Sequence, residues 1–449
     1  MKGYTMNNTV EAILFDLDNT LVNTNSLKEY RESTNKPPLT DEQLSTTKLY
    51  PKTKSILEQL NKNNITLGIV TNSPRKYALD ILDHHGIRDF FETIVTYNEV
   101  GHDGTKPSPQ GINLALSNLN LNNKNNILFI GDDAKDINAS YAAGIKPLAP
   151  AWASKEFIGQ MPAAMISTQC LSEELSNYNH IDLIADRCAN FNTFDIDKKW
   201  LFFIPMNKDG KIGAIKKNEI DFICLGRYFS QKNKLTAKIH EQHTLSKEIY
   251  KKETDPKYVA PEYWVELLSF FVDKTPEYLF DESEKFDIVT VIPAKKGKNR
   301  RLENLLTRLS RHSKNHTTAY ISDLFYFSEG AQSLKTLGRD EREEEINKSL
   351  HFNPKYASII RNAKILIIDD VITTGSTLKG AKSLLEQMQP QRVLSIALAK
   401  TVSISEDMQF CDKCGRLMRV RRNTKTGEHF MGCTGFFVTP QCRHTISIP

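Results

Sequence analysis

The sequence has no long apolar segment. None of its 449 residues lies in an uninterrupted apolar run near the roughly 18 residues that a membrane span requires. The first residues, from Met1 to Tyr4, lead into a polar stretch and not into the apolar core of a secretory signal peptide. We therefore predict a cytoplasmic protein with no membrane partner.

Cysteine is scarce through most of the chain, which contains seven in all. Cys170, Cys188 and Cys224 stand singly, so they do not outline the disulfide framework of a small secreted protein. The other four crowd into the last 39 residues, at positions 411, 414, 433 and 442. In a reducing compartment, this crowding indicates a metal site before a pair of disulfides.

Neither sign of charge is in large excess. The net charge of +5 on so long a chain neither demands nor excludes a nucleic-acid partner. The sequence contains no internal repeat, and 39% hydrophobic residues argue against wholesale disorder. The length suggests about three domains, while the oligomeric state stays open.

Short apolar runs that end in polar clusters alternate with helix-like segments in two parts of the chain. This alternation predicts an α/β multidomain protein. The expected strands are residues 12–15, 67–70 and 127–130 in the first part, and residues 288–292, 365–368 and 393–398 in the second. The predicted domains are residues 1–165, 226–402 and 403–449, with a connecting region at 166–225.

Two carboxylates follow the first expected strand. Asp16 and Asp18 lie two residues apart in a tight turn, an arrangement that can divide nucleophilic and acid/base roles between them. Further polar residues lie near the ends of the later strands or between them: Thr71, Asn72, Lys106, Asp132, Asp133 and Asp136. Four separate segments therefore fit one site at the carboxyl edge of a parallel sheet.

In this order, the four segments resemble the four motifs of the haloacid dehalogenase-like hydrolases, over roughly residues 10–160. The resemblance implies a Rossmann-like domain and a phosphatase that works through an aspartyl-phosphate. Asp16 would attack phosphorus, and Asp18 would protonate the leaving oxygen and later activate water. Thr71, Asn72 and Lys106 would hold the phosphoryl group.

The same resemblance implies a Mg²⁺ site. The ion would lie between Asp16, the backbone carbonyl of Asp18 and Asp132, with Asp136 or Asp133 in support, since Mg²⁺ prefers oxygen ligands. The insertion between the first two strands is short, so any cap over the site is small. The phosphorylated substrate is therefore a nucleotide, a sugar phosphate or a larger phosphorylated end.

A second strand-to-helix transition, near residue 370, is rich in ligand-binding groups. The apolar run 365–368 leads into Asp369 and Asp370, whose carboxylates can hold ribose hydroxyls. A turn of small residues follows: Thr373, Thr374, Gly375, Ser376 and Thr377. Such a turn before a helix favours an anion such as a 5′-phosphate, because the helix N-terminus offers backbone N–H groups and a positive dipole end.

This segment resembles the phosphoribosyl pyrophosphate (PRPP) loop of type I phosphoribosyltransferases. Residues 222–402 resemble the ComF-like branch, in which Gln332, Arg339, Arg342 and Asn347 fit the pattern before the loop. The basic turn with Lys295 and Lys296 would meet the departing pyrophosphate. No segment identifies a base pocket, so the acceptor stays open.

The C-terminal cysteines form a Cys-x₂-Cys pair and a wider second pair. Four thiolates suit tetrahedral, structural Zn²⁺. The set is Cys411, Cys414, Cys433 and Cys442. Without such a staple, residues 403–449 are too few for a stable core.

The segment around these cysteines resembles the C-terminal zinc ribbons of type IA DNA topoisomerases, which engage single-stranded DNA. Arg419, Arg421 and Arg422 are the expected nucleic-acid contacts. Phe430, Phe436 and Phe437 offer faces on which bases can stack, although core packing accounts for any one of these rings at least as well. The strand-passing activity does not follow, because no topoisomerase catalytic segment is present.

Taken together, these features predict a Mg²⁺-dependent phosphatase fused to a PRPP-dependent phosphoribosyltransferase and directed to nucleic acid by a zinc ribbon. The expected setting is nucleotide metabolism or the modification of nucleotides or nucleic acids. One alternative is a DNA-sensing effector of stress or antiviral defence. Another is a noncatalytic, PRPP-responsive DNA-binding regulator.

Overall fold

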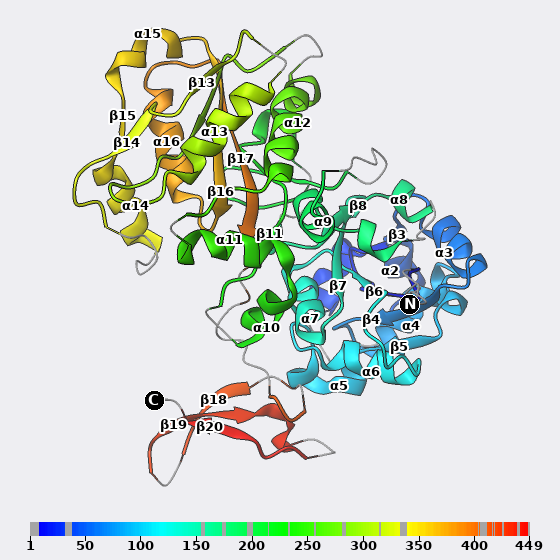
Figure 1. Cartoon of the computed structure of the whole chain (residues 1–449). Coiled ribbons are helices and arrows are strands. Elements are labelled where there is room, and N and C mark those ends of the chain that lie inside the picture. Colours follow the sequence, from blue (N-terminus) through cyan, green and yellow to red (C-terminus); the bar gives the residue numbers. More distant parts are fainter. Residues whose placement is uncertain are drawn as a thin grey trace, which may run out of the picture. The chain divides into compact units, whose positions relative to one another are not determined.

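The protein is described by a computed structural model in two compact units (Figure 1). One unit is Met1–Ile181 with Ser403–Pro449, and the other is Asp182–Val402. The structure describes residues 9–31, 38–153, 158–172, 177–194, 201–213, 215–231, 234–255, 257–280, 284–313, 316–332, 339–402, 404, 411–414, 416, 418–423, 426–437 and 441–447. Within these ranges, no helix is both long enough and apolar enough to cross a membrane.

The first unit contains a six-stranded parallel sheet in the order β5-β4-β1-β6-β7-β8. Its strands are β1 (Ala12–Phe15), β4 (Thr66–Val70), β5 (Thr93–Val95), β6 (Ile127–Ile130), β7 (Lys146–Pro150) and β8 (Ala164–Ile166). The central strands β1 and β6 are buried along their whole length. Parallel strands covered on both faces have this continuous apolar profile.

The described helices of this unit are α1 (Lys28–Arg31), α2 (Asp41–Ser45), α3 (Thr53–Lys62), α4 (Arg75–His84), α5 (Tyr97–Gly104), α6 (Gln110–Asn118), α7 (Ala134–Ala143) and α8 (Thr168–Ser172). One face of the sheet shares a core with α5, α6 and α7, to which α6 contributes Ile112, Ala115 and Leu116. The short strands β2 (Val22–Asn23) and β3 (Lys48–Leu49) form a separate antiparallel pair.

The second unit contains a mixed sheet in the order β13-β12-β16-β17-β10-β9, and β11 also pairs with β17. Its strands are β9 (Ile204–Met206), β10 (Phe222–Cys224), β11 (Arg227–Tyr228), β12 (Ile288–Val291), β13 (Ala319–Ile321), β16 (Lys364–Ile372) and β17 (Arg392–Thr401). Only β9 runs antiparallel to its neighbour among these described pairs. The long neighbours β16 and β17 are seen side by side in Figure 1.

The helices of the second unit are α9 (Ile184–Phe191), α10 (Lys234–Gln242), α11 (Thr244–Thr254), α12 (Glu262–Leu279), α13 (Arg301–His312), α14 (Arg339–Ser349), α15 (Ala357–Ile360) and α16 (Ser376–Glu386). Helix α13 buries Leu302, Leu305, Leu306 and Leu309, the spacing of a helix with one apolar stripe. These residues share a core with α9, α11, α12 and one face of the sheet. Strands β14 (Phe325–Phe327) and β15 (Leu350–Phe352), which lie on either side of α14 in the chain, form a separate antiparallel pair.

The α/β fold and the six expected strands are confirmed by β1, β4, β6, β12, β16 and β17. The range 182–225, assigned from sequence to a connecting region, contributes α9, β9 and β10 to the second unit. Strand β10 pairs in parallel with β17, and Ile223 and Leu225 lie in the core. Most of this range is therefore part of the second fold.

The C-terminal segment forms a three-stranded antiparallel sheet in the order β18-β19-β20. The strands are β18 (Met418–Arg422), β19 (His429–Cys433) and β20 (Thr445–Ser447). Its described buried core consists of Cys411, Met418, Met431 and Cys433. Two of these four residues are cysteines, so little apolar surface stabilises the sheet.

Candidate active sites

The first site lies at the carboxyl edge of the parallel sheet. Asp16 directly follows β1, Thr71 directly follows β4, and Asp132 follows β6 after one glycine. Carboxylate oxygens of Asp16, Asp132 and Asp136 lie within 4.8 Å of one another. The topology thus gathers three acids that are up to 120 residues apart in the sequence.

Lys106 inserts a positive charge among these acids. Its Nζ lies 2.6 Å from Asp16 Oδ1 and 2.5 Å from Asp136 Oδ1, and its side chain is only 4% exposed. The Asn72 side chain holds the backbone of Lys106, accepting from its N–H at 2.8 Å and donating to its carbonyl at 2.9 Å. Burial alone would lower the pKa of Lys106, but Asp136 and Asp16 raise it above its ordinary value. The lysine therefore stays charged.

Gly131 allows Asp136 to approach the site. A Cβ at position 131 would lie 2.4 Å from Cγ of Asp136, closer than real contacts allow. Asp136 is further held by the start of α7, where its Oδ2 accepts from the Asp133 N–H at 3.0 Å. Asp133 caps the helix by accepting from Lys135 N at 2.9 Å. In this arrangement Asp136 faces the acid cluster and Asp133 acts as a helix cap.

Asp18 is surrounded by donors. It accepts from Ser73 Oγ at 2.6 Å, Thr24 Oγ1 at 2.7 Å and the Tyr77 hydroxyl at 2.8 Å. Arg31 Nη1 lies 3.2 Å from the same carboxylate. Burial and Asp18 raise the pKa of Tyr77, so its hydroxyl keeps the proton that it donates.

Tyr77 and Arg31 had no signal in the sequence beyond their residue type. Each comes from a helix, α4 or α1, and reaches Asp18 only through the tertiary fold. Thr71, which was expected to bind phosphate, is 3% exposed, and its hydroxyl accepts from Ser73 N at 3.1 Å.

The three acids fit a divalent cation. Burial, with nearby acids, raises the pKa of Asp16 to about 7 although Lys106 opposes the shift. Burial and the charges of Asp136 and Asp16 raise the pKa of Asp132 to about 8. Burial also raises the pKa of Asp136. A hard cation with a preference for oxygen would remove this repulsion, and Mg²⁺ has that chemistry.

This electrostatic arrangement predicts a pH-dependent response to Mg²⁺. A group whose pKa is raised by folding stabilises the fold less as pH rises from its unfolded pKa through its folded pKa. That window runs from pH 3.8 to about 7 for Asp16 and from pH 3.8 to about 8 for Asp132. We expect the melting temperature of the metal-free protein to decrease as the pH rises from about 5 to about 9. Mg²⁺ should raise the melting temperature more at pH 9 than at pH 5. Differential scanning calorimetry with EDTA or Mg²⁺ measures both effects. Equal stabilisation by Mg²⁺ at both pH values would contradict this prediction.

The second site lies where β16 leads into α16. Asp369 and Asp370 are near the end of β16, and Gly375, with φ +79°, precedes the first residue of α16. The hydroxyls of Thr374 and Ser376 lie 2.9 Å apart, and that of Thr373 lies 3.2 Å from Thr401 Oγ1. The hydroxyl-rich turn is thus at the helix N-terminus, as the sequence predicted, and Thr377 lies in the first turn of the helix.

The two neighbouring acids of this site have different surroundings. Asp370 pairs with Lys252 Nζ at 2.8 Å and with Arg301 Nη2 at 2.6 Å. These two cations lower the pKa of Asp370 against the opposing effect of burial. Burial and Asp370 raise the pKa of Asp369 to about 7. Lys252 and Arg301 were missed from sequence because the basic residues beside each of them form no motif that singles it out.

The two lysines of the predicted pyrophosphate turn contact a different segment. Lys295 Nζ donates to the backbone carbonyl of Gln332, and Lys296 Nζ pairs with Glu329. Lys296 is 77% exposed, so its ion pair contributes little to stability. No described contact joins either lysine to the acids at the end of β16.

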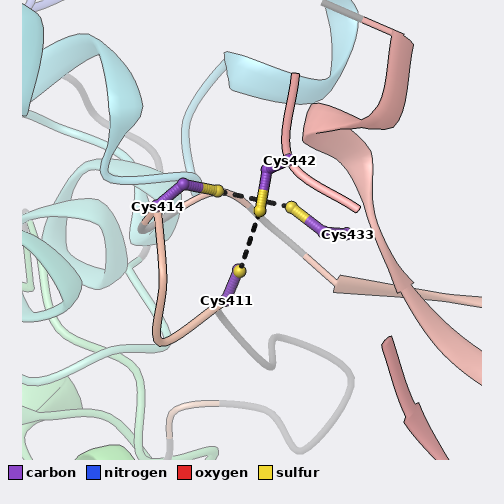
Figure 2. A group of neighbouring side chains, drawn as sticks. All are labelled: Cys411, Cys414, Cys433 and Cys442. Carbon is purple, nitrogen blue, oxygen red and sulfur yellow. Dashed lines mark hydrogen bonds between the residues drawn. The ribbon is translucent and has the colours of Figure 1, made fainter. Parts of the chain in front are cut away.

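The four C-terminal cysteines converge as expected from their spacing. Figure 2 shows that their sulfur atoms point toward one another, and all four lie within 4.8 Å. The closest pairs are Cys411–Cys442 at 3.7 Å and Cys414–Cys433 at 3.4 Å. A disulfide needs about 2.05 Å, whereas a tetrahedral site with Zn–S near 2.3 Å separates sulfurs by about 3.8 Å. The arrangement therefore fits Zn²⁺ and not two disulfides.

The predicted nucleic-acid contacts lie on β18. For Arg419 and Arg422 the structure describes only the strand backbone, and their side chains are outside the described set. The side chain of Arg421 lies against Gly432 on β19, where an added Cβ would be 2.7 Å from Arg421 Cδ. Elsewhere in this segment, the Arg443 guanidinium lies 5.9 Å from the centre of the exposed Phe436 ring.

Comparisons with known proteins match two separate parts of the chain to protein families. Residues 27–149 match the family model of haloacid dehalogenase-like hydrolases. The pyrophosphatase PpaX of Oceanobacillus iheyensis is 30% identical over 188 residues, which cover 33% of this chain and 86% of that protein. The chain belongs to the haloacid dehalogenase-like hydrolases. Its hydrolase domain is joined to a second domain, because residues 280–422 match the phosphoribosyl transferase domain.

Other relatives of the hydrolase domain are more distant or match a shorter part. A phosphoglycolate phosphatase of Yersinia pseudotuberculosis is 36% identical over 96 residues, which cover 21% of this chain and 40% of that protein. The solved structure of CbbY from Rhodobacter sphaeroides in complex with phosphate has 19% identity and a TM-score of 0.29. The matched region covers 36% of this chain and 96% of the CbbY chain. The family assignments establish that the chain is an enzyme.

Proposed function

We propose that the two domains catalyse consecutive reactions of nucleotide metabolism or of nucleotide or nucleic-acid modification. The phosphoribosyltransferase domain uses PRPP and releases pyrophosphate, and the hydrolase domain cleaves that pyrophosphate. One observation carries this proposal. A hydrolase centre related to a pyrophosphatase is present in the same chain as a domain whose family reaction produces pyrophosphate. Hydrolysis of the product would pull the transfer reaction forward.

In the transfer step, a nucleophilic acceptor attacks C1 of the ribose. The bond from C1 to the acceptor forms, the bond from C1 to the pyrophosphate oxygen breaks, and the acceptor loses a proton. Asp369 binds ribose hydroxyls, and the turn that contains Thr373, Thr374, Gly375, Ser376 and Thr377 binds the 5′-phosphate. The position of this turn at the N-terminus of α16 supports the second role.

In the hydrolytic step, Asp16 attacks one phosphorus atom of pyrophosphate. The bridging P–O bond breaks, Asp18 protonates the departing phosphate, and a water molecule deprotonated by Asp18 then cleaves the aspartyl-phosphate. Lys106 and Thr71 hold the phosphoryl oxygens, while Asn72 positions Lys106 through its backbone. Asp16, Asp132, Asp136 and the carbonyl of Asp18 would hold a Mg²⁺ ion, whose positive charge would reduce the repulsion between Asp16 and the anionic substrate.

The C-terminal segment binds structural Zn²⁺ through its four cysteines and directs the enzyme to single-stranded nucleic acid. The arginines on β18 and the ring of Phe436, which is 43% exposed, support the second role. Whether nucleic acid is the acceptor, or a signal that activates the chain, is decided by the activity assay.

The assay measures PRPP consumption, pyrophosphate and phosphate with a panel of nucleobases, with and without single-stranded DNA. Wild-type enzyme should release two phosphates for each PRPP consumed. The Asp16→Asn variant should instead accumulate one pyrophosphate, since it lacks the nucleophile. Asp89→Asn, which changes an exposed aspartate of the same domain, is the matched control and should behave as wild type.

Each of the other outcomes contradicts the coupled reactions or favours another function. If pyrophosphate accumulates equally with wild type and Asp16→Asn, pyrophosphate is not the substrate of the hydrolase and the coupling fails. Activity that requires single-stranded DNA would favour a DNA-sensing effector of stress or defence. PRPP binding without pyrophosphate release for any acceptor would favour a noncatalytic regulator.

A further inference from the structure

Asp370 holds two cations that come from two different helices. Lys252 in the last turn of α11 contacts Oδ1, and Arg301 at the start of α13 contacts Oδ2 through Nη2 and Nε, at 2.6 and 2.7 Å. The three side chains are 9%, 25% and 5% exposed for Lys252, Arg301 and Asp370. A buried acid with two bases is an unusual concentration of charge.

Strand geometry explains why only one of the two acids has these partners. Leu366 and Ile368 on β16 face the core that contains α11, α12 and α13. Successive side chains of a strand point to opposite faces, so Asp370 lies on this same face and Asp369 on the other. Asp370 is therefore the acid that meets the helices.

Helix α11 holds Lys252 in a fixed place. Leu245 and Ile249, one turn apart, are fully buried in the core. The hydroxyl of Ser246 accepts from Phe229 N at 2.9 Å and lies 2.9 Å from Nδ1 of His243, the capping residue of the helix. The ammonium group is thus positioned by a rigid element, before any ligand binds.

Both cations retain unused donors. A lysine has three N–H donors and an arginine five, and among the described residues each finds only the Asp370 carboxylate. The buried hydroxyl of Tyr258 also has no hydrogen-bond partner in the described part of the chain. The Tyr258 carbonyl accepts from Asn299 at 3.2 Å, which ties this tyrosine to the segment just before Arg301. Lys252, Arg301 and the Tyr258 hydroxyl therefore offer N–H and O–H donors to a ligand near the hydroxyl-rich turn, and charged donors of this kind suit an anion.

The charges at this point are balanced, so they do not repel an anion. Asp369 and Asp370 alone would repel the pyrophosphate group of PRPP, but with Lys252 and Arg301 the four groups sum to no net charge. Lys295 and Lys296, the lysines expected to meet pyrophosphate, instead contact Gln332 and Glu329.

We propose that Lys252 and Arg301 bind the pyrophosphate end of PRPP, and that Asp370 is the positioning residue that holds both of them. This inference rests on the proposed PRPP-dependent function. Lys252 lies N-terminal to residues 280–422, the part that matches the family model, so the chain adds a ligand-binding residue from outside that match.

The test compares two ligands that differ only in the pyrophosphate group. Isothermal titration calorimetry with Mg²⁺ measures binding of PRPP and of ribose 5-phosphate to the full chain carrying Asp16→Asn, so that neither is hydrolysed. Lys252→Met and Arg301→Met should each weaken PRPP binding by at least ~10-fold and change ribose 5-phosphate binding less than ~2-fold. Lys252→Arg should retain most of the PRPP affinity. The matched control is Lys251→Met, an exposed lysine on the same helix.

Three results would overturn the inference. Equal losses for both ligands would make Lys252 a structural support, and unchanged PRPP binding would exclude contact with the pyrophosphate group. If the Asp16→Asn chain with Lys252 and Arg301 intact did not bind PRPP at all, the proposed function would fail together with this inference. The first two results would overturn only the inference. If Lys252→Met does not fold, as judged by its melting temperature, Lys252→Gln replaces it, since the amide keeps a donor for Asp370 without the charge.

Discussion

Lys106→Met is expected to lower the kcat of phosphate-ester or pyrophosphate hydrolysis by roughly 10²–10³-fold, the usual effect of removing one group that stabilises developing negative charge. The Nζ of Lys106 lies 2.6 Å from the Asp16 carboxylate, which must approach an anionic phosphorus centre. Without that charge, Asp16, Asp132 and Asp136 repel both one another and the substrate. The measurement is kcat with saturating substrate and Mg²⁺.

The same substitution should also destabilise the fold. Removing one partner of a buried ion pair costs about 3–5 kcal/mol, because the remaining charge stays buried without compensation. The side chain of Lys106 is 4% exposed and those of Asp16 and Asp136 are 10% and 2% exposed, so solvent does not screen the loss. Urea unfolding near pH 8 should reveal the full effect. The loss should shrink near pH 5, where protonation removes the charge that the lysine balanced.

Lys135→Met is the matched control for this prediction. Lys135 lies in the first turn of α7, close in sequence to Asp132 and Asp136, but its side chain is exposed. Surface substitutions of this kind usually change stability by less than about 0.5 kcal/mol. If Lys106→Met were no less stable and no less active than Lys135→Met, the charge assignment at the acid cluster would be wrong.

The parts of the fold that could be predicted from sequence are those with a local signal. The runs at 12–15 and 127–130 are apolar throughout because both faces of their sheet are covered. The first ends directly before Asp16, and the second is separated from Asp132 by one glycine. Parallel topology then brings Asp16 and Asp132 to one edge without further information. The hydroxyl-rich turn before α16 was predictable for the same reason, since its chemistry is contiguous in the chain.

The residues that could not be predicted act across long separations. Lys252 and Asp370 are 118 positions apart, and nothing around Lys252 distinguishes it from the exposed Lys251 beside it. The neighbouring acids Asp369 and Asp370 look equivalent in sequence, but the alternation of β16 sends them to opposite faces and gives their pKa values opposite shifts. Strands β9 and β10 have three residues each, too few for a recognisable pattern, so their place in the second sheet was not apparent.

Removal of metal from the C-terminal segment should unfold that segment and leave the two α/β domains folded. The described buried core there contains Met418 and Met431 as its only residues other than cysteines. Structural Zn²⁺ supplies about 10–16 kcal/mol in small domains of this kind, far more than two methionines can. We expect one zinc per chain by mass spectrometry of the metal. After chelation, trypsin should cleave within residues 411–447 while the rest of the chain resists.

Cys411→Ser tests whether the zinc ion or the β-sheet itself stabilises this segment. Cys411 is 2% exposed and its sulfur lies 3.7 Å from that of Cys442, so serine removes a ligand with little change in volume. If Cys411→Ser lost both its zinc and its resistance to protease, the metal would be what holds the sheet together. Cys170→Ser, which alters a cysteine far from the cluster in sequence, should retain both properties. If Cys411→Ser instead lost zinc but kept its resistance, β18, β19 and β20 would be stable without metal, and the four sulfurs would serve a role other than folding.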